Sequence, residues 1–77
     1  MKERILQVLS ELRPEYDFTE PGHDFVEEGM IDSLDIVSIV DVAEEEFGAS
    51  IPGTEILPEN FKDIDAIVRI ITKYRTA

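Results

Sequence analysis

With 77 residues, the chain is expected to form one domain, residues 1–77, too short to enclose an active site made of several positioned groups. It has no cysteine, which excludes disulfides and thiolate metal sites, and its net charge of -11 disfavours nucleic acid and anionic membranes as partners. No apolar run approaches the roughly 20 residues that span a bilayer, and no signal-type segment follows Met1-Lys2-Glu3, so we expect a cytoplasmic protein without membrane insertion.

The first predicted helix covers residues 2–13. Ile5, Leu9 and Leu12 follow the i, i+4, i+7 spacing of an amphipathic helix, so this face is expected to meet the core. Pro14 ends the predicted helix, because a proline forces the residue before it out of the helical region.

A long loop, residues 14–31, is predicted next, with turn signals at Pro21-Gly22 and Gly29. A loop of this length in a small domain usually has a function or its own packing anchors. We expect three apolar side chains to anchor it in the core, namely Phe18, Phe25 and Ile31. Gly29 and Met30 are expected to keep the approach to the second helix narrow and adaptable.

The second predicted helix covers residues 33–47, and Gly48 is placed to end it. A stripe at helical spacing is expected to be buried, consisting of Ile36, Ile39, Val40, Ala43 and Phe47. The opposite side carries three apolar residues that we expect to be partly exposed among carboxylates: Leu34, Val37 and Val42. Such a surface can offer a partner both apolar contact and electrostatic steering, although isolated exposed apolar residues are also common without any partner.

After a second loop, residues 49–58, Pro58 predicts a short helix over 58–62, because proline is favoured at the first helical position. The last predicted helix covers residues 63–74, with an inner face made of Ile64, Ile67, Val68, Ile71 and Tyr74. The predicted fold class is therefore all-α: a small four-helix bundle of three main helices and one short helix, with the long loop between helices 1 and 2.

Acidic residues dominate the middle of the chain. From Pro14 to Phe61 there are fourteen Asp or Glu residues and neither Lys nor Arg. Such a field attracts basic patches on partner proteins and speeds encounter with them. The carboxylates lack the spacing of an EF-hand loop, so we predict no metal site.

Asp32 and Ser33, at the start of the second helix, both suit the N-cap position. A chemical role for the serine is the rival interpretation, because a helix N-terminus favours anions and would tolerate a phosphodiester on Ser33, although Asp32 and Asp35 would partly oppose it. A catalytic serine needs a positioned base and an oxyanion hole. The single histidine, His23, lies in the predicted loop without an identifiable partner, so we predict that the chain is not an enzyme.

Residues 24–71 resemble acyl carrier proteins. The match is dense around the second helix, and it consists of Phe25, Gly29, Asp32-Ser33-Leu34-Asp35, Val37, Val40, Glu44-Glu45-Glu46-Phe47 and Ile51-Pro52. The resemblance implies that Ser33, flanked by Asp32 and Leu34, carries covalent 4′-phosphopantetheine. A separate phosphopantetheinyl transferase would add this group from coenzyme A with magnesium, and its thiol would hold acyl or aminoacyl groups as thioesters.

The resemblance also implies that partner enzymes dock on the second helix, at Leu34, Asp35, Val37 and Glu44, and we extend this predicted surface to Asp41 and Glu45. Asp41 and Ser38 depart from the methionine and glutamate that fatty-acid carriers often have there. We therefore expect a stand-alone, monomeric carrier in lipid or secondary-metabolite biosynthesis, served by an acyl or aminoacyl ligase and by synthases or transferases with basic patches.

Two alternatives remain open. The segment Pro52-Gly53-Thr54-Glu55 is similar to the corresponding loop of D-alanyl carrier proteins, so the chain could be a D-alanyl or other aminoacyl carrier. The other alternative is an acidic interaction module that is never modified, in which Ser33 only caps the helix and the second helix binds a basic partner.

Overall fold

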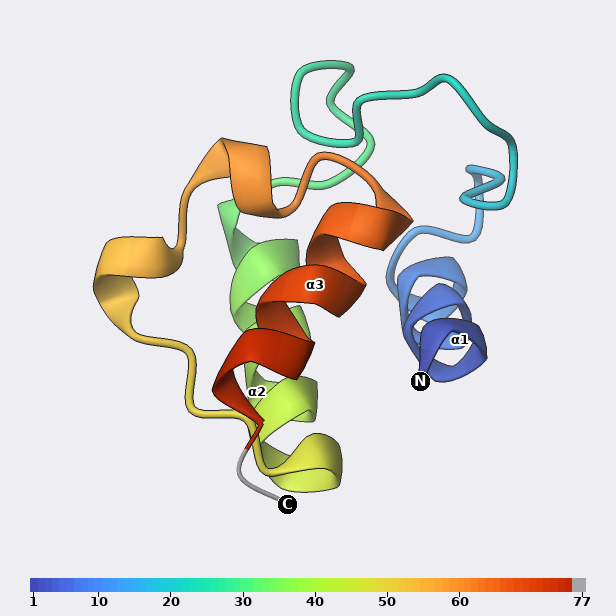
Figure 1. The fold of residues 1–77 in the computed structure, drawn as a ribbon. Coiled ribbons are helices and arrows are strands. Elements are labelled where there is room, and N and C mark those ends of the chain that lie inside the picture. The colour runs from blue at the N-terminus through green and yellow to red at the C-terminus, as the bar shows by residue number, and fades with distance from the viewer. Residues whose placement is uncertain (76–77) are drawn as a thin grey trace.

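The computed structural model describes residues 1–75, so the last two residues of the predicted domain lie outside it. Three α-helices form, α1 (Lys2–Leu12), α2 (Ser33–Phe47) and α3 (Ile64–Tyr74), and two 3-10 turns, η1 (Gly53–Glu55) and η2 (Pro58–Asn60), join α2 to α3 (Figure 1). No strand occurs among residues 1–75, where Ala49 and Arg75 share only an isolated antiparallel bridge. The all-helical fold class is confirmed.

The predicted fourth helix is confirmed only in part. Residues 58–60 form a single 3-10 turn, closed by i+3 bonds from Asn60 N–H to the Leu57 carbonyl (2.9 Å) and from Phe61 N–H to the Pro58 carbonyl (3.1 Å). Proline starts this turn as expected, but a segment so short gains too few hydrogen bonds to propagate as an α-helix. The turn η1 before it was not predicted.

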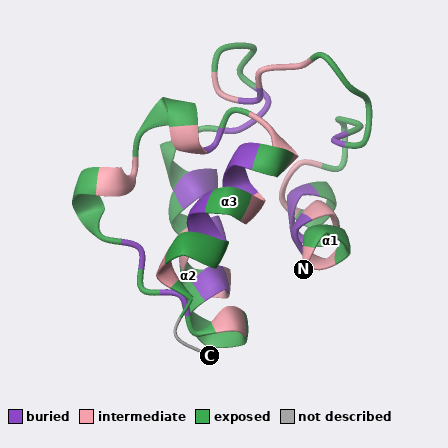
Figure 2. Cartoon of the chain, viewed as in Figure 1, coloured by how far each residue is buried: buried purple, intermediate pink, exposed green. Residues whose placement is uncertain are grey.

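The core lies between the three helices, which turn their buried faces toward one another (Figure 2). Helix α1 contributes Ile5 and Leu9, α2 contributes Ile36, Ile39 and Ala43, and α3 contributes Ala66, Ile67, Ile70 and Ile71. Of the predicted inner face of α3, Ile67 and Ile71 are buried, and Ile64 and Tyr74 are half-buried and pack against the core. The prediction is wrong for Val68, which is half-buried outside the core cluster, and it missed the buried Ala66 and Ile70. On α2, Val40 and Phe47 are likewise only half-buried.

The long loop before α2 is anchored as predicted. Phe18, Phe25 and Ile31 are all buried, and the rings of Phe18 and Phe25 meet edge to face with centroids 5.0 Å apart. The expectation that Met30 keeps the approach adaptable is wrong, because Met30 is also buried in the core cluster.

Backbone hydrogen bonds at Phe25 explain how the loop reaches α2. The Phe25 N–H donates to the Lys62 carbonyl (2.6 Å), which ties the loop to the segment before α3. The Phe25 carbonyl accepts from the N–H groups of Met30 (2.9 Å) and Ile31 (3.1 Å), which closes a compact turn. The chain thus arrives at α2 along a fixed path.

Helix α2 ends as predicted at Gly48, which adopts the left-handed conformation (φ 65°). The N–H of Ala49 then donates to the Ala43 carbonyl (3.1 Å). No helix among residues 1–75 is both long enough and apolar enough to cross a membrane.

Candidate functional site

The start of α2 is a reciprocal capping box, in which each of two carboxylates accepts a hydrogen bond from the other residue's backbone. Asp32 is the N-cap, and its Oδ1 accepts from the N–H groups of Leu34 (3.0 Å) and Asp35 (3.1 Å). Oδ2 of Asp35 accepts from the Asp32 N–H (3.0 Å). The cap is therefore Asp32, and Ser33 is the first helical residue.

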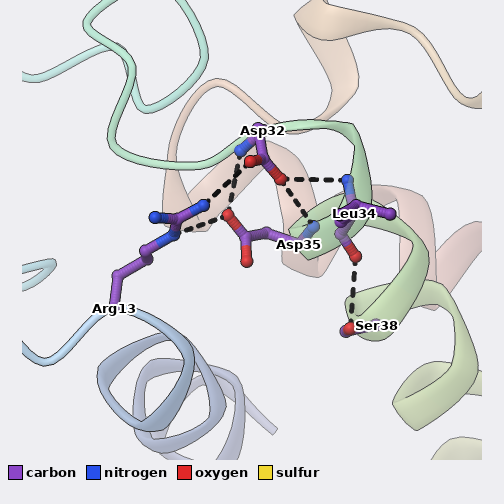
Figure 3. A network of polar contacts seen from close by, with 5 residues as sticks. All are labelled: Arg13, Asp32, Leu34, Asp35 and Ser38. Atoms are coloured by element: carbon purple, nitrogen blue, oxygen red, sulfur yellow. Dashed lines mark hydrogen bonds and ion pairs between the residues drawn. The ribbon is translucent and has the colours of Figure 1, made fainter.

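Ser33 is exposed, and no residue in the described part of the chain forms a hydrogen bond with its hydroxyl. Its neighbour Leu34 is 75% exposed, and Val37 is 52% exposed. By contrast, the Ser38 hydroxyl one turn later donates to the Leu34 carbonyl (3.2 Å; Figure 3). The Ser33 hydroxyl is thus exposed and engaged with no residue among 1–75.

An arginine directly after α1 joins the capping box. Arg13 donates through Nε to Asp35 Oδ2 and through Nη2 to Asp32 Oδ2, each at 2.8 Å, and so spans both carboxylates (Figure 3). The pKa of Asp32 is lowered, first by the backbone N–H of Asp35 and further by the positive charge of Arg13. The hydrogen bond to Asp35 in turn raises the pKa of the Arg13 guanidinium.

Arg13 was not identified from the sequence as a site residue. It lies 19 residues before Asp32 and 22 before Asp35, across the long loop, so no local pattern links it to them. The available signal was its position as the last cation before the acidic stretch.

The predicted docking residues separate into two groups. Leu34, Val37, Asp41, Glu44 and Glu45 are exposed on α2, and their spacing of three or four residues places them along one face that begins at Ser33. Asp35 does not belong to this face. It is only 6% exposed, and its carboxylate is occupied by Arg13 and by the Asp32 N–H.

His23 has partners that the sequence did not reveal. Its Nδ1 lies 2.7 Å from Oε1 of Glu28 and its Nε2 lies 3.1 Å from Oε1 of Glu20, contacts that raise the pKa of the imidazole. The second oxygen of Glu28 accepts from the Asp24 N–H (2.6 Å). Among residues 1–75, no hydrogen bond or ion pair joins His23 to Ser33. In the same part of the chain, no group of histidine, aspartate or glutamate side chains could hold a metal ion.

The capped helix, the projecting serine and the helical fold can be compared with known proteins. Residues 3–71 match the family described as phosphopantetheine attachment site, and the chain therefore belongs to that family. Searches of curated proteins and of solved structures gave no significant match.

Family membership settles the general chemistry. Proteins of this family bind 4′-phosphopantetheine covalently through a serine, and they are carriers without catalytic activity, so this chain is not an enzyme. Such carriers interact with phosphopantetheinyl transferases, synthases and other transferases.

Proposed function

We propose that Ser33 carries the 4′-phosphopantetheine and that the protein is a monomeric acyl carrier of the cytoplasm. The observation that supports this proposal is the exposed Ser33 hydroxyl, without a hydrogen-bond partner among residues 1–75, on the first residue of α2. The helix dipole at that end favours the negative phosphodiester. The backbone N–H groups at the start of α2 are less available to bind the phosphodiester, because Asp32 already accepts hydrogen bonds from two of them.

The other three serines are poorer candidates. The Ser38 hydroxyl is engaged with the backbone of its own helix. Ser10 lies in the last turn of α1 and Ser50 lies beyond the end of α2, so both are at the negative ends of helix dipoles.

The chain's own part in this function is presentation and docking. The bound group supplies the thiol that holds an acyl or aminoacyl cargo as a thioester. We assign docking to the α2 face, defined as Leu34, Val37, Asp41, Glu44 and Glu45, on which two exposed apolar residues offer burial and three carboxylates steer basic partners. Asp35 is left out of this surface because it is buried.

Modification can be tested directly. The protein is incubated with coenzyme A, magnesium and a broad-specificity phosphopantetheinyl transferase, and its intact mass is measured. We expect the addition of one group, abolished by Ser33→Ala and retained in Ser10→Ala, Ser38→Ala and Ser50→Ala. A mass increase that persists in Ser33→Ala would refute the assignment, and no increase with several transferases would favour the acidic interaction module instead.

The cargo needs a separate measurement. The turn η1 contains most of the segment that is similar to the loop of D-alanyl carriers, so an aminoacyl cargo remains the rival of an acyl one. The mass of the protein isolated from its native host distinguishes them, because a retained aminoacyl group and a retained acyl chain differ in mass and in nitrogen content.

A further inference from the structure

Arg13 holds the start of α2 from outside that helix. It is the C-cap residue of α1, and its own N–H donates to the Leu9 carbonyl (2.9 Å), which fixes its backbone. Its side chain, 33% exposed, reaches a buried carboxylate at Asp35 and an exposed one at Asp32. A planar guanidinium can bridge two acceptors in this way, whereas a lysine ammonium is a single point charge.

The contact leaves neither oxygen of Asp32 free. Oδ1 accepts from the backbone of α2, and Oδ2 accepts from Arg13. The carboxylate therefore cannot turn toward the neighbouring Ser33 hydroxyl without breaking one of these bonds. Asp35 depends on the arginine even more, because without it a buried carboxylate would keep only the Asp32 N–H as a partner.

We propose that Arg13 is a positioning residue for the modification of Ser33. By bridging Asp32 and Asp35 it locks the capping box, and the locked first turn of α2 presents the Ser33 hydroxyl in one place. This inference rests on the proposed function, since it concerns the rate at which Ser33 is modified.

The chain contains a matched control at the other end of α2. Arg4, on α1, donates through Nε to Glu46 Oε1 (2.8 Å) and through Nη2 to Glu46 Oε2 (2.7 Å). Both arginines therefore join α1 to α2 by paired charge-assisted bonds, but only Arg13 touches the helix start. A general loosening of α1 from α2 would follow from losing either one.

The test compares Arg13→Met with Arg4→Met at a temperature where circular dichroism shows both variants folded. With a phosphopantetheinyl transferase we expect kcat/KM to fall at least about tenfold for Arg13→Met, mainly through kcat, because a misplaced hydroxyl slows the chemical step. Arg4→Met should stay within about twofold of the parent protein. Should Arg13→Met not fold, the double variant Arg13→Met/Asp35→Asn removes the buried charge left behind and takes its place.

Hydrogen exchange gives a second readout that does not need the transferase. The amides of Leu34 and Asp35 should exchange faster in Arg13→Met and at the parent rate in Arg4→Met. An unchanged modification rate in Arg13→Met, an equal loss in both variants, or a rise in KM alone with unchanged exchange would overturn the proposal. If the parent protein were never modified, the proposed function would fail, while the exchange rates would still report whether Arg13 holds the helix start.

Discussion

Asp35 is an acidic residue inside a small core, which requires partners for its charge. The side chain accepts from Arg13 and from the Asp32 N–H, and the residue is only 6% exposed. Its position four residues before Ile39 and eight before Ala43 puts it on the buried side of α2. The resemblance to carrier proteins implied that Asp35 docks partner enzymes at the surface. The helical spacing alone would have placed it correctly on the buried side of α2.

Because Asp35 is buried and Asp41 is exposed, replacing each by alanine should change the stability of the protein by different amounts. Asp35→Ala leaves the Asp32 N–H and the Nε–H of Arg13 without their acceptor, and we expect a loss of about 1–3 kcal/mol in the free energy of unfolding. Asp41→Ala, at an exposed position, should change it by less than about 0.5 kcal/mol. Urea unfolding measures both, and equal effects would show that Asp35 is not a structural residue.

The contacts of His23 should make the stability of the protein depend on pH. Glu28, and then Glu20, raise the pKa of its imidazole in the folded protein. A raised pKa means that the stabilising contribution is complete below the ordinary value of about 6.5 and disappears as the pH rises through the folded value. Glu15 and Asp17 border the same cleft and add negative charge around His23.

The measurement compares His23→Gln with the parent protein by urea unfolding between about pH 6 and about pH 9. The variant should be less stable than the parent at the acidic end, and the difference should shrink toward the alkaline end. A difference that does not vary with pH would mean that the His23 contacts do not depend on its charge.

The site was predictable from sequence where it is local. Asp32 and Ser33 lie next to each other at the start of a periodic stretch, so a capped helix with a serine on its first turn could be expected from composition and spacing alone. Arg13 could not be found in this way, because the loop between residue 13 and Asp32 is fixed by Phe25 and its contacts with the Lys62 backbone. Only the folded chain brings the arginine to the carboxylates.

At the level of the elements, the two ends of α2 are set by residues that can be recognised in the sequence, namely Asp32 at its start and Gly48 at its end. Gly48 has a positive φ of 65°, a conformation that residues with a Cβ adopt at a cost. Gly48→Ala should therefore destabilise the protein by about 1–2 kcal/mol.

Gly53→Ala is the control for this prediction. An added Cβ at Gly53 would meet no atom within 4 Å, and its φ is not in the positive region. Thermal unfolding should show a lower midpoint for Gly48→Ala and little change for Gly53→Ala. A similar shift in the two variants would argue against the left-handed end of α2.

The elements themselves followed from hydrophobic spacing, whereas their exact faces did not. Tyr74 was expected on the inner face of α3, but its hydroxyl donates to Glu55 Oε2 (2.8 Å), and the same oxygen pairs with Lys73. These contacts bring the end of α3 against η1 and leave Tyr74 half-buried at the rim. Since η1 was not predicted, this orientation could not be either.

At the level of the whole molecule, negative charge surrounds the proposed docking face. On the α2 face, Asp41, Glu44 and Glu45 form no ion pair with any residue among 1–75, whereas Glu46 beside them pairs with Arg4. We expect Glu44→Lys to raise the KM of a phosphopantetheinyl transferase several-fold and to reduce its salt dependence, because steering charge is lost and reversed.

Glu27→Lys is the matched control, since it changes the net charge by the same amount at an exposed loop position. Its KM should stay close to that of the parent protein. If both charge reversals raise KM equally, the transferase responds to the overall charge of the carrier, and the α2 face has no special role in this encounter.

Arg4 lies in α1 and Arg13 directly follows that helix, and neither arginine lies on the face assigned to docking. In these proposals, the residue that positions Ser33 for modification and the residues that contact partner enzymes therefore lie on different segments of the chain. A substitution at residue 13 should therefore change the rate at which Ser33 is modified and leave the residues assigned to docking in place.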